Sequence, residues 1–391
     1  MKLVSDLRMN KKSKIFIIDL KREFNFLKKE INQQINDCLN LQHWILGKKT
    51  EEFEKAISKY LNLKYAIGVA SGTDALTISL QALALKLKGK EFFDQTDQII
   101  TTPFTFIATA EAILRAGAKI VFVDINPDTF NIDPQKIKKA ITKNTVGILA
   151  VHLFGLPCAM DEIKKIACEN NLFVVEDVAQ AFGARFKNSL VGTFGNAGAF
   201  SFFPTKNLGC YGDGGLVATD DLRIAEFTKI LRNHGQIKQY IADYIGYNSR
   251  LDTLQAAILL TKLRFVEKFN NWRKSIADRY NKALSLIKNI TIPKQPEDCQ
   301  HAYHLYTIKI KKNLRNKLLS FLNQNGIQAR VYYPVGLHKM KAFRGAKLIE
   351  ELKITEEITS SVISLPIHPF LKIEEVDYII KTIESFFIKL K

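Results

Sequence analysis

The feature that most constrains this chain is an alternation, between residues 50 and 220, of short β-branched runs with amphipathic stretches of helical period. This alternation is typical of βαβ units, because parallel strands need a crossover segment, usually a helix, between them. It predicts an α/β fold with a mostly parallel sheet covered by helices on both faces. Expected strands lie at 65–70, 98–102, 119–124, 146–153, 172–177, 198–204 and 214–219, and expected helices at 72–85, 108–115, 136–141 and 160–169.

The pattern changes after residue 222, where the chain becomes mainly helical through residue 284. A shorter mixed segment runs from residue 303 to the end, with strand-like stretches at 305–310 and 330–333. A chain of 391 residues is long enough for a large domain and a smaller one. We therefore expect an N-terminal arm and a large α/β domain over residues 1–255, and a helical linker with a small α+β domain over residues 256–391.

The formal net charge of +18 raises the question of nucleic-acid binding. The basic residues are spread along the whole chain, and no helix-turn-helix or base-stacking pattern lies among them, so we expect no nucleic-acid partner. A positive surface would also attract a small anionic substrate. The apolar stretch at 15–18 is too short for a signal peptide, and no run is long enough to span a membrane, so we expect a cytoplasmic protein.

Cysteine and histidine spacing predicts no metal site. The five cysteines include no C-x-x-C pair, which favours reduced, mostly structural thiols over zinc ligands or a disulfide framework. His301 and His304 lack companions at metal-ligand spacing and are interpreted as packing or surface residues.

The sequence Ser71-Gly-Thr-Asp-Ala-Leu76 takes an expected strand end through glycine into a helix. A helix N-terminus offers free N–H groups and a partial positive charge, and Gly72 lets an anion approach the backbone closely. Considered alone, the segment is better interpreted as an ordinary serine or threonine cap, because such caps are a common way to begin a helix.

Two further segments carry charged residues in unusual surroundings. Asp177 ends a hydrophobic run, at the edge where open α/β sheets bind ligands, and it either caps a helix or pairs with a buried cation. Lys206 follows an apolar strand and precedes a glycine-rich loop ending at Gly215. Desolvation there would lower the pKa of the lysine and make it a nucleophilic amine, although most lysines are surface charges.

Five motifs in order now carry a resemblance: SGTDAL, TPFTFIATAEAI, VEDVAQAFGA, FSFFPTKNLGCYGDGG and YNSRLDTLQAAIL. Together they resemble the DegT/DnrJ/StrS sugar aminotransferases, of fold type I among the pyridoxal 5'-phosphate enzymes, over nearly the whole chain. The resemblance implies a mostly parallel, seven-stranded type of sheet between helices. It also implies a homodimer with shared active sites.

The resemblance implies a role for each matching residue. Lys206 would hold the cofactor as a Schiff base and then move protons, and Asp177 would pair with the pyridine nitrogen. The remaining matches would contact the ring or the phosphate: Phe106 stacking on the ring, Gln180 beside its phenolic oxygen, Gly72, Thr73 and Ser201 at the phosphate, and Asn248 reaching the phosphate from the partner subunit.

The resemblance also suggests the substrates, a nucleotide-linked keto sugar and L-glutamate as amino donor. The motifs look most like enzymes that aminate the 3-keto position, especially on UDP-N-acetyl-3-keto-glucuronate. Arg250 would bind the sugar acid group across the dimer, although the same arginine occurs in relatives whose sugars have none. Phe182 stands where histidine often occurs, and Tyr332-Tyr333-Pro334 replaces the usual HYP, which places both tyrosines at the substrate.

Three alternatives remain open at this point. One is an aminotransferase for a dTDP- or UDP-linked 3-keto or 4-keto-6-deoxy sugar. A second is a sugar dehydratase of the same family, in which histidine replaces the Schiff-base lysine, and Lys206 argues against it. The third is a non-catalytic regulatory or binding protein with the same fold.

Overall fold

The computed structural model describes residues 14–390. Part of the N-terminal segment considered above for a signal peptide, residues 1–13, therefore lies outside the described residues. In order along the chain, the helices are α1 (Leu20–Leu41), α2 (Lys48–Leu61), α3 (Gly72–Lys88), α4 (Ile107–Arg115), α5 (Pro134–Ala140), η1 (Leu153–Gly155), α6 (Met160–Glu169), α7 (Leu222–Leu231), α8 (Thr253–Leu263), α9 (Val266–Leu284), α10 (Lys312–Gln324), η2 (Leu337–Lys339), η3 (Lys341–Phe343), α11 (Lys353–Ser361) and α12 (Ile373–Ile388).

The strands of the large sheet occur in the order β1-β9-β8-β5-β4-β2-β3-β15, and most neighbours run parallel. Only β9 runs antiparallel to its two neighbours. The expected mostly parallel sheet between helices is confirmed. Its strands are β1 (Tyr65–Val69), β2 (Gln98–Thr101), β3 (Lys119–Phe122), β4 (Thr145–Val151), β5 (Phe173–Asp177), β8 (Ala197–Ser201), β9 (Gly215–Thr219) and β15 (Lys347–Leu348).

The sheet has one strand more than expected, because β15 adds to its edge beside β3. This two-residue strand comes from the C-terminal part of the chain, and no alternation of apolar and polar residues could reveal it. The C-terminal segment therefore does not stay apart from the large sheet.

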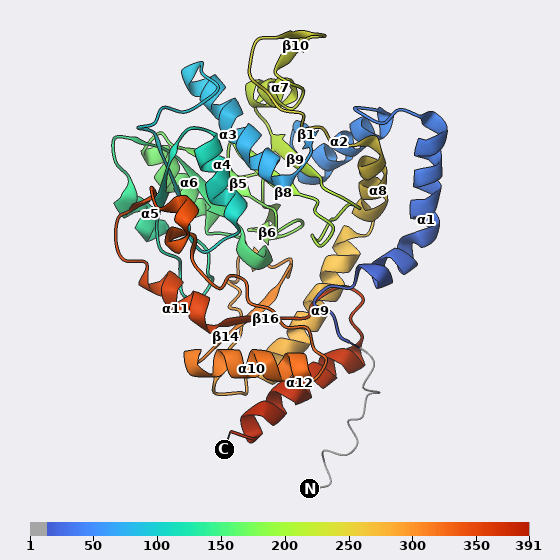
Figure 1. Ribbon diagram of the computed structural model, residues 1–391, viewed down its shortest axis with the longest axis vertical. Coiled ribbons are helices and arrows are strands. Elements are labelled where there is room, and N and C mark those ends of the chain that lie inside the picture. Colours follow the sequence, from blue (N-terminus) through green and yellow to red (C-terminus); the bar gives the residue numbers. More distant parts are fainter. Residues whose placement is uncertain (1–13, 391) are drawn as a thin grey trace.

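Helix α3 lies against the large sheet, where Figure 1 shows it in blue beside β1 and β9. Ser71 caps its N-terminus by accepting a hydrogen bond from the Asp74 N–H at 3.1 Å, and Gly89 ends it with φ of 68°. The stretch Ala75–Leu85 is buried throughout, which suits a helix enclosed between the sheet and other helices.

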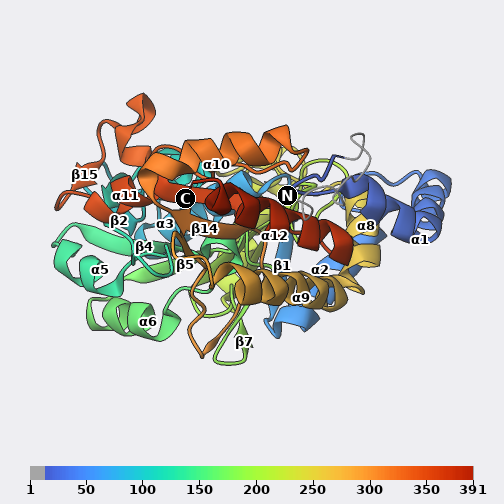
Figure 2. The same cartoon turned by 90° about the horizontal axis from the view of Figure 1, so that it is seen from below.

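The small sheet, in the order β12-β14-β16, is antiparallel and packs with α9, α10 and α12 around its own hydrophobic core. Seen from below in Figure 2, α12 lies between α10 and α9, in front of β14. The remaining strands are β6 (Arg185–Phe186), β7 (Ser189–Leu190), β10 (Gln236–Lys238), β11 (Ile241–Ala242), β12 (Ile290–Thr291), β13 (Cys299–Gln300), β14 (Tyr306–Ile310) and β16 (Val362–Leu365).

Two sequence expectations are wrong. The segment between α7 and α8 is not helical but forms the β10–β11 hairpin, which projects at the top of Figure 1. The stretch 330–333 is not a strand either, since only Arg330 pairs, through an isolated bridge to Ser364. Its two tyrosines instead line the cavity described below.

All five cysteines are free, and all but Cys168 are buried. Within residues 14–390, no group of histidine, cysteine and acidic residues could hold a metal ion, and no helix is long and apolar enough to cross a membrane.

Candidate active site

A cavity of about 680 Å³ opens at the carboxyl ends of the central parallel strands. This edge of an open α/β sheet is where such folds usually bind ligands. The cavity brings together nine of the eleven residues singled out from the sequence: Gly72, Thr73, Phe106, Asp177, Gln180, Ser201, Lys206, Tyr332 and Tyr333.

The N-terminus of α3 forms one end of this cavity. The N–H groups of Gly72 and Thr73 lie in the first turn of the helix and have no acceptor within it. A Cβ atom on Gly72 would lie only 2.5 Å from the Cβ of Ser201, so the glycine is required by the close approach of β8. The result is an anion cradle made of helix N–H groups and, from β8, a serine hydroxyl.

Asp177 lies at the end of β5 and is only 5% exposed. Its carboxylate accepts hydrogen bonds from the Thr109 hydroxyl at 2.9 Å and from the Ala179 N–H at 3.1 Å. Burial raises the pKa of Asp177 above its ordinary value, while Thr109, Ala179 and the nearby Lys206 oppose that rise. A cationic partner in the cavity would therefore stabilise the ionised form.

Lys206 lies on the turn that follows β8, where its backbone N–H donates to the Phe203 carbonyl at 2.8 Å. Burial lowers the pKa of Lys206 to about 8, although the negative charge of Asp177 acts in the opposite direction. A lysine with such a pKa has a substantial fraction of free amine near neutral pH, which is the form that attacks a carbonyl carbon.

Gln180 connects the large sheet to the tyrosine pair. Its Nε2 donates to the Tyr333 hydroxyl at 2.9 Å, and its Oε1 accepts from the Phe154 N–H at 2.8 Å. Desolvation raises the pKa of Tyr333, so its phenol stays protonated. Phe106, in contrast to the fully buried Phe104, leaves 53% of its surface exposed at the cavity, where a flat ligand could stack on it.

A second carboxylate, Glu176, lies next to Asp177 on β5 but points into the protein and is fully buried. It accepts hydrogen bonds from the N–H groups of Gly192, Phe194 and Gly195, each at 2.7 Å. His152 Nε2 lies 3.0 Å from it. Since His152 Nδ1 accepts from the Cys158 N–H at 3.0 Å, Nε2 must carry the proton of a neutral ring.

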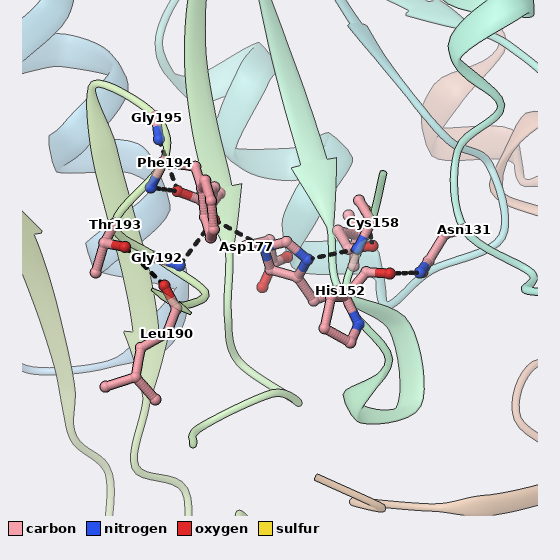
Figure 3. A network of polar contacts seen from close by, with 12 residues as sticks. Asn131, His152, Cys158, Asp177, Leu190, Gly192, Thr193, Phe194 and Gly195 are labelled. Carbon is pink, nitrogen blue, oxygen red and sulfur yellow. Dashed lines mark hydrogen bonds and ion pairs between the residues drawn. The ribbon is translucent and has the colours of Figure 1, made fainter. Parts of the chain in front are cut away.

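Figure 3 shows this network, which includes Gly195, His152 and Cys158. Its central group is the Glu176 carboxylate, which contacts both the Gly195 N–H and His152. It joins the ends of β4 and β5 to the turn that leads into β8. The buried carboxylate therefore holds the turn before β8, the strand that ends at Ser201 and is followed by the turn with Lys206. Sequence reasoning missed Glu176, although it stands inside the VEDVAQ segment next to Asp177.

Asn248 and Arg250 do not line this cavity. Asn248 is exposed and forms an isolated bridge with Asn233, and Arg250 donates a hydrogen bond to the Asn233 side chain at 3.0 Å. Both lie between the projecting β10–β11 hairpin and α8.

Further cavity residues had no clear signal in the sequence. His304 is 5% exposed and lies 3.2 Å from the Asn207 side chain through Nδ1, so the packing interpretation holds but the surface one does not. Arg330 brings a positive charge into the cavity, and Ile17 and Ile18 come from the distant N-terminal segment. Only tertiary contact places them there.

Comparison with known proteins places the chain in a family. Residues 25–384 match the model of the DegT/DnrJ/EryC1/StrS aminotransferase family. The chain belongs to this family of aminotransferases. The expectation of a sugar aminotransferase is thereby confirmed.

Three similar proteins differ in their names. A "Pleiotropic regulatory protein" of Geobacillus stearothermophilus is 40% identical over 95% of this chain and 98% of its own length. A dTDP-3-amino-3,6-dideoxy-alpha-D-galactopyranose transaminase of Aneurinibacillus thermoaerophilus is 40% identical over 94% and 98%. A UDP-2-acetamido-2-deoxy-3-oxo-D-glucuronate aminotransferase of Pseudomonas aeruginosa is 37% identical over 91% and 96%.

Two solved structures show the same fold. DesV of S. venezuelae superimposes with a TM-score of 0.90 and 35% identity, covering 95% of this chain and 98% of its own. NtdA of Bacillus subtilis, with bound cofactor PMP, superimposes with a TM-score of 0.84 and 33% identity, covering 94% and 82%.

Proposed function

We propose that this protein is a pyridoxal phosphate-dependent aminotransferase that transfers an amino group from L-glutamate to a nucleotide-linked 3-keto sugar. One observation carries the proposal: Lys206, Asp177 and the N-terminus of α3 meet around a single cavity. A partly buried amine, a buried carboxylate and an anion cradle match the aldehyde, the ring nitrogen and the phosphate of this cofactor, and the PMP bound in NtdA supports the choice.

Each residue then has a chemical task. The cradle formed by Gly72, Thr73 and Ser201 holds the phosphate, and the exposed face of Phe106 packs on the ring. Asp177 stabilises positive charge on the ring nitrogen, and the bound cofactor supplies an electron sink. Lys206, which has a pKa lowered to about 8, would provide the amine for covalent attachment and would afterwards move a proton between the two carbon atoms bonded to the transferred nitrogen.

The preferred substrate is a UDP-2-acetamido-3-keto sugar of the glucuronate type, as in the name of the Pseudomonas aeruginosa relative. Arg250 is the proposed ligand of the sugar carboxylate, because a guanidinium group binds a carboxylate in a bidentate manner. The alternative is a dTDP- or UDP-linked 3-keto or 4-keto-6-deoxy sugar, which the Aneurinibacillus thermoaerophilus relative favours. Tyr332 and Tyr333 would contact either sugar from the cavity wall.

We further propose a homodimer with shared active sites. Asn248 and Arg250 lie outside the cavity of their own chain, so they could contact cofactor and sugar only in a partner subunit. Arg250→Ala should then weaken binding of a uronate substrate while leaving cofactor binding unchanged. A monomer in sedimentation experiments that is fully active would contradict this arrangement.

The deciding experiment incubates the cofactor-loaded protein with L-glutamate and a panel of 3-keto and 4-keto nucleotide sugars, and measures release of 2-oxoglutarate. We expect the fastest release with the UDP-linked 3-keto uronate. Faster release with a 4-keto sugar would contradict the regiochemistry, and release with no sugar of the panel would contradict the substrate class.

A regulatory protein without catalysis is the second candidate, because one relative carries a regulatory name. The two functions separate by spectroscopy and by a Lys206→Ala variant. If the protein is an enzyme, added pyridoxal phosphate gives an absorbance band of a covalent adduct that sodium borohydride fixes to Lys206, and the variant loses both the band and turnover. No band in the unmodified protein would favour the regulatory function.

A further inference from the structure

A second cavity, of about 750 Å³, lies on the far side of the wall segment 334–339. It is as large as the active-site cavity but is built from residues 288–291 around β12, the end of β14, the first residue of α10, helix α11 and this segment. Figures 1 and 2 both show α10 and α11 beside β14. None of the residues proposed above for cofactor or sugar lines it.

The walls of this cavity carry a surplus of positive charge. Five lysines line it against two glutamates: Lys288, Lys309, Lys311, Lys312 and Lys339 against Glu356 and Glu357.

Two of these lysines are already paired, Lys339 with Glu356 at 2.7 Å and Lys309 with Glu357 at 3.7 Å. Among the ion pairs of the described residues, the other three lysines have no acidic partner. The cavity therefore has three positive charges that an anionic ligand could neutralise.

The backbone adds a further anion-binding element. Helix α10, of 13 residues, begins at Lys312 with no side-chain cap and no acidic residue in its first turn. Lys311 and Lys312, at this N-terminus, line the cavity, so the partial positive charge of the helix end lies beside it without a carboxylate to neutralise it. His338, with a side chain only 6% exposed, lines the same cavity, with its Nε2 3.5 Å from Glu356 and its Nδ1 without a hydrogen-bond partner within residues 14–390. On a neutral ring with Nε2–H toward Glu356, Nδ1 is an acceptor, so His338 adds no donor for an anion.

We propose that this cavity binds a small molecule carrying a phosphate or diphosphate group, at a site separate from the active site. Phosphate oxygens suit both lysine ammonium groups and helix N–H groups, and the volume exceeds what inorganic phosphate alone would fill.

The site is placed to act on the active site through a shared wall. Tyr332 and Tyr333 face the active-site cavity, and the residues that follow them face the second cavity. The Leu337 N–H donates to the Pro103 carbonyl at 2.9 Å, which ties the wall to the loop that carries Phe106. A ligand that shifts this wall would therefore move side chains that contact the sugar.

The test measures binding of inorganic pyrophosphate to the cofactor-loaded protein by isothermal titration calorimetry. The variant Lys311→Glu/Lys312→Glu reverses two charges at the cavity. The matched control, Lys164→Glu/Lys165→Glu, makes the same charge change at two exposed positions on α6. We expect the dissociation constant to rise about tenfold or more in the cavity variant and less than about twofold in the control.

Hydrogen exchange with the same probe separates the two cavities. Pyrophosphate should slow exchange in residues 311–314 and 334–339. Slowing confined to residues 71–74 would place the anion in the active-site cavity and overturn the proposal. Equal weakening in both double variants, or no binding by the unmodified protein, would overturn it as well. None of these measurements requires aminotransferase activity, so they can fail or succeed independently of the proposed reaction.

Discussion

The two adjacent carboxylates of β5 have opposite surroundings. Asp177 faces the cavity, accepts two hydrogen bonds, and has its pKa raised by burial. Glu176 faces the core and is surrounded by three backbone N–H groups and His152. A buried carboxylate whose acceptor sites are filled stabilises the fold, whereas one with acceptor sites still unfilled is available to a ligand. We therefore expect a substitution of Asp177 to affect activity and a substitution of Glu176 to affect stability.

The largest expected effect is on activity, and it follows from a substitution of Asp177, the carboxylate that faces the cavity. Asp177→Asn keeps the shape of the side chain but removes its charge, so turnover with glutamate and the keto sugar should fall on the order of 10²–10³-fold. The free energy of unfolding should change little. The control Asp298→Asn, on an exposed carboxylate, should leave turnover unchanged. Activity of Asp177→Asn within tenfold of the parent would show that the charge is not needed.

The variant Glu176→Gln tests whether the carboxylate that faces the core stabilises the fold. An amide oxygen can accept from some of the four donors, but its NH₂ group would face N–H groups that then lose their acceptor. We expect a loss of about 2–4 kcal/mol in the free energy of unfolding, measured by urea denaturation. The exposed Glu169→Gln, on α6, should stay within about 0.5 kcal/mol of the parent. Equal stability of the two variants would refute the anchoring role of Glu176.

The lowered pKa of Lys206 predicts how the rate of covalent cofactor capture depends on pH. Because burial lowers this pKa from 10.5 to about 8, the free amine accumulates at lower pH than in a solvated lysine. The rate at which added pyridoxal phosphate is captured covalently should rise about tenfold per pH unit below pH 8 and then level off. Stopped-flow absorbance measures this rate. A rise that continues to pH 10 would mean that the cavity leaves the lysine solvated.

The smallest effect concerns the exposed ring at the cavity mouth. Phe106→Ala removes a stacking surface, worth about 1 kcal/mol, and should weaken cofactor binding about fivefold. Fluorescence titration of the cofactor-free protein measures this affinity. Phe92→Ala removes a similarly exposed ring that does not line the cavity and should have no effect. Equal affinities in the two variants would exclude stacking by Phe106.

Much of the large sheet was predictable because its strands and helices alternate with clear periodicity. The edge strand β15 and the β10–β11 hairpin were not, since two or three residues are too few to show a period. The stretch 330–333 contains aromatic residues typical of strands, but contacts with Gln180 and the cavity determine its conformation instead.

The sequence by itself determined the family, and it supplied the residues proposed for the chemistry, because Lys206, Asp177 and Gly72 stand in ordered motifs with a physical reason for each residue type. Only the tertiary structure decided which neighbour on β5 faces the cavity. Alternation along a strand places Glu176 and Asp177 on opposite faces, but the packing of loop 192–195 and His152 fills one face and leaves the other open. The lysine-lined second cavity likewise exists only because segments far apart in the chain meet there.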